Sequence, residues 1–161
     1  MLKIFDYDKR DGFAIFTMNR PERLNALGRE MQEHRNAALA DFNADPGMRA
    51  GILTGAGRAF SAGGDLKEMA DRDAGPGHQF AAGSGHGTSI NQLMRWAMSP
   101  KPIVAAVNGL ALGGGLETAL DCDIRICSTE AYFGLFEPKR GIMAGYGAQH
   151  LPRCIGLSAA S

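Results

Sequence analysis

The sequence predicts an α/β protein in which short buried strands alternate with helices. Two short runs rich in β-branched and aromatic residues, "FAIFTM" (13–18) and "AGILTG" (50–55), have the character of strands. A third run, "KPIVAAVNG" (101–109), is apolar throughout, which predicts a strand buried on both faces of a parallel sheet. Strands that alternate with helices at this spacing indicate an α/β fold with right-handed crossovers.

The segments between these strands have helical spacing or turn chemistry. Pro21 ends the first strand, and "NADPG" (43–47) closes the helix that follows. Further along the chain, "LETALD" (116–121) predicts a short helix, "CDIRIC" (122–127) and "AYFG" (131–134) predict extended segments, and residues 146–161 predict a helix. The buried face expected for the first helix consists of Met31, Arg35, Ala38, Leu39 and Phe42.

We assign structural roles to three residues in this region and before it, namely Asp121, Asp123 and Trp96. Asp121 and Asp123 bracket Cys122, which favours caps or turn formers, and Trp96 is expected on a packing face. The Gly-rich stretch 73–87 is expected to be a surface loop, followed by a helix near 89–98. His78 and His86 in that loop lack a neighbouring ligand at metal-binding spacing, so we predict no metal site there.

Composition excludes several classes of protein. The chain has 161 residues, the size of one domain, and its 17 basic residues balance its 17 acidic ones, which argues against a general nucleic-acid or membrane-surface binder. The charged opening "MLKIFDYDKRDG" lacks the apolar core of a signal peptide, and no stretch approaches the roughly 20 apolar residues of a membrane span, so we expect a cytoplasmic protein. The 3 cysteines form no CxxC pair and are expected to be reduced core thiols.

The 22 glycines, about twice the roughly 7% average usage, are clustered where strands give way to helices. "GRAFSAGGDL" (57–66) and "LGGGLE" (112–117) each leave unpaired backbone N–H groups at a helix N-terminus. Two such groups aimed at one point would form an oxyanion hole, although either cluster alone fits a tight turn equally well. Neither matches a phosphate-binding glycine motif. Asp65 and Glu68 have the spacing of an N-cap with a reciprocal carboxylate.

Two glutamates stand near these turns. Glu117 follows the triple glycine, where the positive end of a helix dipole is expected to stabilise its ionised form. Glu137 lies between Phe136 and Pro138, apolar neighbours that are expected to desolvate it. Two carboxyl groups in contrasting environments suit general acid and base catalysis, whereas each acid taken singly also fits a helix cap or a surface charge.

Four motifs in order resemble the successive signatures of the crotonase superfamily, the enoyl-CoA hydratase/isomerase family. They are "NRPERLNAL", "GRAFSAGGDLKEM", "KPIVAAVNGLALGGGLETALDCDIRI" and "FGLFEPKRGI", and the resemblance extends from about Ile15 to the end of the chain. It implies a crotonase-like (ClpP/crotonase) spiral of β-β-α units, and an assembly of trimers or hexamers. It also implies that residues 1–161 form a single core domain without the C-terminal helical region of family members.

The resemblance assigns roles to individual residues. The oxyanion hole would be formed by the backbone N–H groups of Gly64 and Gly114, and Glu117 and Glu137 would hold and activate one water. The adenine of coenzyme A would contact the backbone at Ser61, Ala62 and Gly63, and its phosphates would lie near Arg23 and Lys67. Family hydratases often carry Pro before the second glutamate, whereas Pro138 follows it here.

The resemblance thus implies an enoyl-CoA hydratase that adds water to a trans-2-enoyl-CoA, with an acyl-CoA thioester as partner and with no metal or redox cofactor. An enoyl-CoA isomerase, or another acyl-CoA lyase or hydrolase of the superfamily, is the alternative. Family isomerases generally need only the second glutamate, so Glu117 favours hydration. A third hypothesis is an inactive truncated fragment that binds coenzyme A or forms oligomers.

Overall fold

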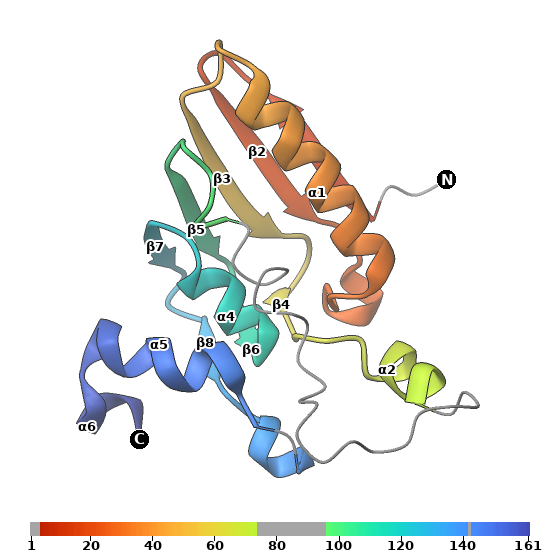
Figure 1. Ribbon diagram of the computed structural model, residues 1–161, viewed down its shortest axis with the longest axis vertical. Helices are drawn as coiled ribbons and strands as arrows, with labels where there is room; N and C mark the ends of the chain where they lie inside the picture. Colours follow the sequence, from red (N-terminus) through yellow and green to blue (C-terminus); the bar gives the residue numbers. More distant parts are fainter. Residues whose placement is uncertain (1–3, 74–95, 142) are drawn as a thin grey trace.

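The computed structural model describes residues 4–73, 96–141 and 143–161, and it confirms the α/β class (Figure 1). A five-stranded sheet has the strand order β1-β2-β3-β5-β7. Only the β1–β2 pair is antiparallel, whereas β2–β3, β3–β5 and β5–β7 are parallel. The strands of this sheet are β1 (Phe5–Lys9), β2 (Phe13–Met18), β3 (Ala50–Gly55), β5 (Ile103–Val107) and β7 (Ile124–Cys127).

A second, three-stranded sheet has the order β4-β6-β8 and is parallel. Each of its strands follows directly on a strand of the larger sheet, and a helix then follows, so the chain advances as β-β-α units. The spiral expected from the sequence is therefore the observed architecture. The strands of this sheet are β4 (Ala59–Ser61), β6 (Leu110–Leu112) and β8 (Tyr132–Gly134).

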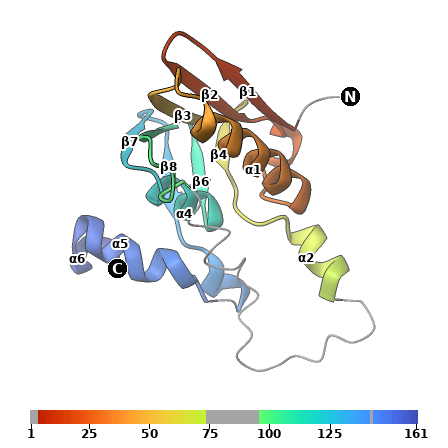
Figure 2. The same cartoon turned by 45° about the horizontal axis from the view of Figure 1, so that its top comes forward.

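The helices close the successive units. Figure 2 shows α2 and α5 on the side of the molecule where the smaller sheet lies, away from the β1–β2 pair. Pro21 stands in the first turn of the 3₁₀ helix η1, and Pro138 in that of η2, where a missing N–H costs nothing. The helical segments are η1 (Pro21–Arg23), α1 (Arg29–Ala44), α2 (Leu66–Asp73), α4 (Gly114–Leu120), η2 (Glu137–Arg140), α5 (Gly145–Ile155) and α6 (Leu157–Ala160).

The core lies between α1 and the larger sheet. Phe16 of β2 is fully buried and makes edge contacts with Phe42 and Trp96, with ring centroids 5.3 and 5.0 Å apart. Such aromatic pairs contribute about 0.5–1.5 kcal/mol each beyond the area they bury. The packing role predicted for Trp96 and the buried face predicted for α1 are both confirmed.

Three strands were missed by the sequence analysis, namely β1, β4 and β6. The last two are only three residues long, and "AFS" and "LAL" carry no alternation by which a strand is identified. Residues 101–109 were predicted to be buried on both faces of the sheet. Only one face of β5 is fully buried, since Val104 and Ala106 on the other face remain partly exposed. The loop expected at 73–87 with its two histidines, and most of the helix expected at 89–98, lie outside the described residues.

Two cysteine assignments are wrong. Cys122 is buried as expected, but Cys127 on β7 and Cys154 on α5 are exposed. Strand β7 is an edge of the larger sheet, and its isoleucines Ile124 and Ile126 are 54% and 59% exposed.

No helix within the described ranges is long and apolar enough to cross a membrane.

The N-termini of α1 and α2 are both capped by side chains of residues 65–68. Asp65 accepts hydrogen bonds from the N–H groups of Lys67 and Glu68, as expected of an N-cap. The reciprocal bond expected from Glu68 is not made: both of its oxygens lie 3.0 Å from the N–H of Arg29 at the start of α1. Glu68 therefore caps a different helix, because Gly28 before that helix has no side chain to do so.

Asp121 and Asp123 do not cap their own helix and strand but bind backbone from other segments. Asp121 Oδ2 accepts from the N–H of Trp96 and of Ala97, at 2.9 and 3.3 Å, and Asp123 Oδ2 accepts from Ile103 at 2.7 Å. The other oxygen of Asp121 is buried and has no hydrogen-bond partner within the described residues. Burial raises the pKa of Asp121 to about 6, against the opposing effect of these two hydrogen bonds and of the nearby Arg35 charge.

The raised pKa of Asp121 predicts a stability that falls with pH. The folded state holds this proton more tightly than the unfolded chain, so the contribution is fully present below the ordinary pKa of 3.8 and is lost as pH rises through about 6. We expect the free energy of unfolding to fall by up to ~3 kcal/mol across this window. Urea titrations of Asp121→Asn should lack that step, whereas the exposed Asp11→Asn should retain it. A step of equal size in both variants would contradict the assignment.

Candidate functional site

The two glycine turns predicted to act together are in direct backbone contact. Gly63 has a φ of +90°, and a Cβ placed on it would lie 2.7 Å from the carbonyl oxygen of Leu112 and 3.1 Å from the nitrogen of Gly114. A Cβ on Gly114 would lie 3.7 Å from the nitrogen of Gly64. Glycine is required at position 63 because any side chain would separate the two turns.

Some of the backbone N–H groups around this contact donate hydrogen bonds, and others have no acceptor among the described residues. Ala62 donates to the carbonyl of Leu24 at 2.9 Å, and Gly63 donates to the hydroxyl of Ser61 at 3.2 Å. The N–H of Gly64 donates no hydrogen bond within the described part of the chain, and Gly64 is exposed. Gly114 is the first residue of α4, so its N–H has no partner inside the helix, and none is found elsewhere among the described residues.

Glu137 lies against the same turn. Its Oε1 is 2.9 Å from the position that a Cβ on Gly113 would occupy, and Gly113 has a φ of +52°. Its Oε2 is buried and has no hydrogen-bond partner within the described residues. The carboxyl group of Glu137 therefore approaches the backbone next to Gly114 with one oxygen unsatisfied, an arrangement that is costly in a resting protein and typical of a site awaiting a ligand or water.

Glu117 is buried, with 5% of its surface exposed, and α5 packs against its side chain. Its Oε1 accepts a hydrogen bond from the N–H of Gly147 at 2.7 Å. Burial raises the pKa of Glu117, and the nearby charge of Glu137 raises it further, whereas the N–H groups of Gly147 and Tyr146 lower it. The stabilised ionised form expected at the start of the helix is wrong in its net direction, because desolvation outweighs the hydrogen bonds.

The structure thus brings Gly64, Gly114, Glu117 and Glu137 into one cluster, although they come from three β-β-α units. The positions expected to bind coenzyme A lie beside it. Ser61 is fully buried, and its hydroxyl donates to the carbonyl of Asn25 at 2.9 Å, so its side chain supports the turn.

Arg23 and Lys67 are exposed and lie around Asp65, the residue after Gly64. The guanidinium of Arg23 is 3.9 Å from Asp65 Oδ1, and the backbone N–H of Lys67 is bound to the same oxygen at 3.1 Å. Arg23 in η1 and Lys67 in α2 are therefore both close in the fold to Asp65, the residue that follows Gly64. No group of three residues within the described ranges could hold a metal ion.

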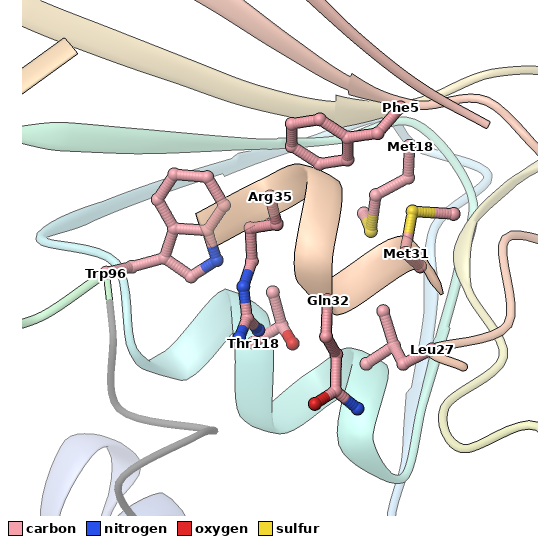
Figure 3. A pocket seen from close by; sticks show the side chains of 8 residues that line it. All are labelled: Phe5, Met18, Leu27, Met31, Gln32, Arg35, Trp96 and Thr118. Atoms are coloured by element: carbon pink, nitrogen blue, oxygen red, sulfur yellow. The ribbon is translucent and has the colours of Figure 1, made fainter. Parts of the chain in front are cut away.

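A pocket opens next to the glycine cluster. Leu27 lies at one end of it, where its Cδ1 is 3.5 Å from the position of a Cβ on Gly114. Figure 3 shows the side chain of Arg35 extending from α1 toward Thr118 of α4. The lining is apolar apart from a few polar groups and consists of Phe5, Met18, Leu27, Met31, Gln32, Arg35, Trp96 and Thr118.

The sequence analysis missed two residues that support the site, Arg20 and Asn25. Asn25 is fully buried in the left-handed region, with a φ of 56°, and its side-chain amide donates to the carbonyls of Ala56 and Ala59. Arg20 forms an ion pair with Asp65 at 2.9 Å. Asparagine is the residue type that tolerates this backbone conformation best after glycine, which is the one signal that could have identified Asn25.

The fold and this cluster define a class of proteins: spirals of β-β-α units with backbone amides and carboxylates gathered at the ends of strands. The sequence profile described as Enoyl-CoA hydratase/isomerase matches residues 8–161. The chain belongs to the enoyl-CoA hydratase/isomerase family.

Relatives with assigned names are similar over nearly the whole chain. The mevalonyl-coenzyme A hydratase SIDH of Beauveria bassiana is 40% identical over 158 residues, which cover 91% of this chain and 54% of the relative. The short-chain-enoyl-CoA hydratase of Clostridium acetobutylicum is 40% identical over 156 residues, covering 95% and 58%. The chain therefore spans little more than half the length of these relatives.

Solved structures show the same fold. An enoyl-CoA hydratase/isomerase from Xanthobacter autotrophicus Py2 is 39% identical with a TM-score of 0.83, over 99% of this chain and 58% of that one. A monofunctional enoyl CoA isomerase from M. smegmatis is 34% identical with a TM-score of 0.74, over 98% of this chain and 65% of that one.

The contact between Glu117 and α5 predicts unequal effects of alanine at two neighbouring glycines. A Cβ on Gly147 would lie 2.7 Å from Leu135 Cδ2 and 3.1 Å from Glu117 Cγ, whereas a Cβ on Gly145 would meet nothing within 4 Å. We expect Gly147→Ala to lower the free energy of unfolding by about 1–3 kcal/mol and Gly145→Ala to leave it unchanged or slightly higher. Thermal unfolding followed by circular dichroism measures both; equal losses would show that α5 does not pack on Glu117 as described.

Proposed function

We propose that the chain carries the reaction centre of an enoyl-CoA hydratase, which adds water across the double bond of a trans-2-enoyl-CoA thioester. The observation that carries the proposal is the cluster itself: two N–H groups without partners among the described residues lie beside two glutamates. The names of the hydratase relatives support the substrate class.

The N–H groups of Gly64 and Gly114 are proposed as the oxyanion hole. Both belong to adjoining glycine turns, so a thioester oxygen could approach them without meeting a side chain. These donors would bind the charge that develops on the thioester oxygen when an enolate forms. Removing one donor of this kind typically costs about 2.7–4 kcal/mol of barrier.

The two glutamates are proposed to hold one water and to divide the proton transfers. One carboxylate takes a proton from the water as the new C–O bond forms at Cβ, and the electrons of the double bond move onto the thioester as an enolate. Protonation at Cα, assigned to Glu137, then completes the addition. The unsatisfied Oε2 of Glu137 and the raised pKa of Glu117 suit groups that exchange protons with a bound water.

Coenzyme A is proposed to lie along the backbone at Ser61, Ala62 and Gly63, with its phosphates near Arg23 and Lys67. The exposure of both residues and their proximity to Asp65, next to Gly64, support this placement. The proposed reaction takes its nucleophile and its protons from water, so no metal or redox cofactor belongs to the proposal.

Isomerisation of an enoyl-CoA is the second candidate function, favoured by the similarity to the isomerase from M. smegmatis. The presence of Glu117 beside Glu137 supports hydration, because a water held between two carboxyl groups has no part in moving a double bond. A homo-oligomer, as a trimer or hexamer, is also proposed. Exposed apolar side chains such as Ile126, Phe133 and Leu157 are the kind that subunit contacts cover.

Hydration is tested by the loss of enoyl-thioester absorbance with crotonyl-CoA. We expect measurable turnover in the wild type and a fall in kcat of about 10²–10⁴-fold in Glu117→Gln and in Glu137→Gln, because each removes one proton-transfer group. Glu33→Gln, on the exposed face of α1, serves as the matched control and should keep full activity. Retained turnover in Glu117→Gln would favour isomerase chemistry. No turnover in the wild type, with coenzyme A still bound in calorimetry, would favour a non-catalytic fragment.

The raised pKa of Glu117 predicts an acidic limb in the pH profile. If Glu117 takes the proton from water it must be ionised, so kcat/KM falls as pH drops through an apparent pKa above the ordinary value of 4.5. Stopped-flow rates between pH 4 and 8 should show this limb in the wild type and in Glu33→Gln. The residual activity of Glu117→Gln should lack the limb. A limb that persists in Glu117→Gln would assign it to another group.

A further inference from the structure

The segment that precedes α1, residues 20–28, runs beside the turn that carries Gly64 and is bound to it at successive positions. We call this segment the strap. Leu24 accepts a hydrogen bond from the N–H of Ala62 at 2.9 Å, and Leu27 donates its N–H to the carbonyl of Gly63 at 2.8 Å. Leu27 and Gly64 also form an isolated parallel bridge. The chain on the N-terminal side of the Gly64 N–H is therefore fixed by backbone contacts.

The chain on the C-terminal side of that N–H is fixed by one side chain, that of Asp65. Its Oδ1 caps α2 through the N–H groups of Lys67 and Glu68, and its Oδ2 accepts from Arg20 Nη1 of the strap at 2.9 Å. Asp65 is 7% exposed and the side chain of Arg20 is 23% exposed, so solvent competes little for this pair. Burial alone would raise the pKa of Asp65, but the hydrogen bonds to Glu68 and Arg20 outweigh it and lower the pKa, as expected of a carboxylate held in its ionised form.

Arg20 is itself tied to the strap. Its backbone N–H donates to Asn25 Oδ1 at 2.8 Å, and its carbonyl accepts from the N–H of Asn25 at 2.9 Å. Asn25 in turn binds Ala56 and Ala59 on either side of the β3–β4 turn. The Arg20 end of the ion pair is thus anchored in backbone that does not depend on α2, whereas the Asp65 end is joined to the start of that helix.

We propose that Arg20 and Asp65 are positioning residues that hold the N–H of Gly64 in the orientation needed for catalysis. The proposal rests on the proposed function, in which that N–H is an oxyanion donor. Gly64 has no side chain, and its N–H donates no hydrogen bond among the described residues. The peptide that carries this N–H is held on one side by the bond from Leu27 to the carbonyl of Gly63 and on the other by the contacts of Asp65. A peptide fixed on both sides before the substrate arrives needs no reorganisation when charge develops, which is the basis of oxyanion stabilisation.

The ion pair can be broken without removing the helix cap. Asp65→Asn keeps an oxygen for the N–H groups of Lys67 and Glu68 but turns an amide donor toward Arg20. Arg20→Met removes the other partner. The matched control is Arg29→Gln, which breaks an exposed ion pair with Glu33 of similar length, 2.8 Å, on the nearby helix α1.

We expect kcat with crotonyl-CoA to fall at least tenfold in Asp65→Asn and in Arg20→Met, with KM changed less than threefold. The double variant should lose no more than the worse single variant, because both substitutions break the Arg20–Asp65 ion pair, and Asp65→Asn additionally removes the longer 3.9 Å pair with Arg23. Arg29→Gln should behave as wild type. Unchanged kcat in both single variants, or losses that multiply in the double variant, would overturn the proposal.

A second measurement does not need turnover. The ¹⁵N order parameter of the Gly64 amide should be near the rigid value of about 0.85 in the wild type and in Arg29→Gln, and should fall toward about 0.6 in both ion-pair variants. An inactive wild type would refute the proposed function. The order parameters would still test, without any activity, whether Arg20 and Asp65 hold the Gly64 amide in place. An order parameter that is the same in all four proteins would overturn the positioning role.

Discussion

The structure depends on backbone packed directly against backbone where the two sheets meet. A Cβ on Gly63 would collide with the carbonyl of Leu112, and a Cβ on Gly115 would collide with the carbonyl of Ser61. These contacts bring the end of β4 and the residues after it, Gly63 and Gly64, against the end of β6 and the start of α4. The candidate site lies where this packing leaves the N–H groups of Gly64 and Gly114 without an acceptor among the described residues.

The same packing places charged groups where water is scarce. Glu117 projects from α4 into the space covered by α5, and Glu137 reaches the turn from η2, so two carboxyl groups share a partly desolvated region. Holding them there costs stability, and hydrogen bonds from Gly147 and Tyr146 offset only part of the cost of Glu117. Buried ionisable groups with perturbed pKa values, held at a cost in stability, are typical of functional sites.

Support for the site comes from residues of the motifs to which the sequence analysis assigned no role at the site. The strap contributes Arg20 and Asn25, whose side chains and backbone bind the β3–β4 turn and the residue after Gly64. Glu68 joins the starts of α1 and α2 by capping a helix from which it is distant in sequence. The network ties the first helix to the turn that carries Gly64, so the two are expected to move as one unit.

The sequence by itself determined the fold class, the strands β2, β3, β5 and β7, the buried face of α1 and the positions of the two glycine turns. Each follows from local chemistry, namely periodicity, apolar runs and the backbone freedom of glycine. Only the tertiary structure decided that Glu68 caps α1 and that Asp121 and Asp123 bind distant backbone. The raised pKa of Glu117, contrary to the local prediction, likewise follows from α5, which covers it. These outcomes depend on groups far apart in the chain, and burial by a remote helix leaves no pattern in the residues around it.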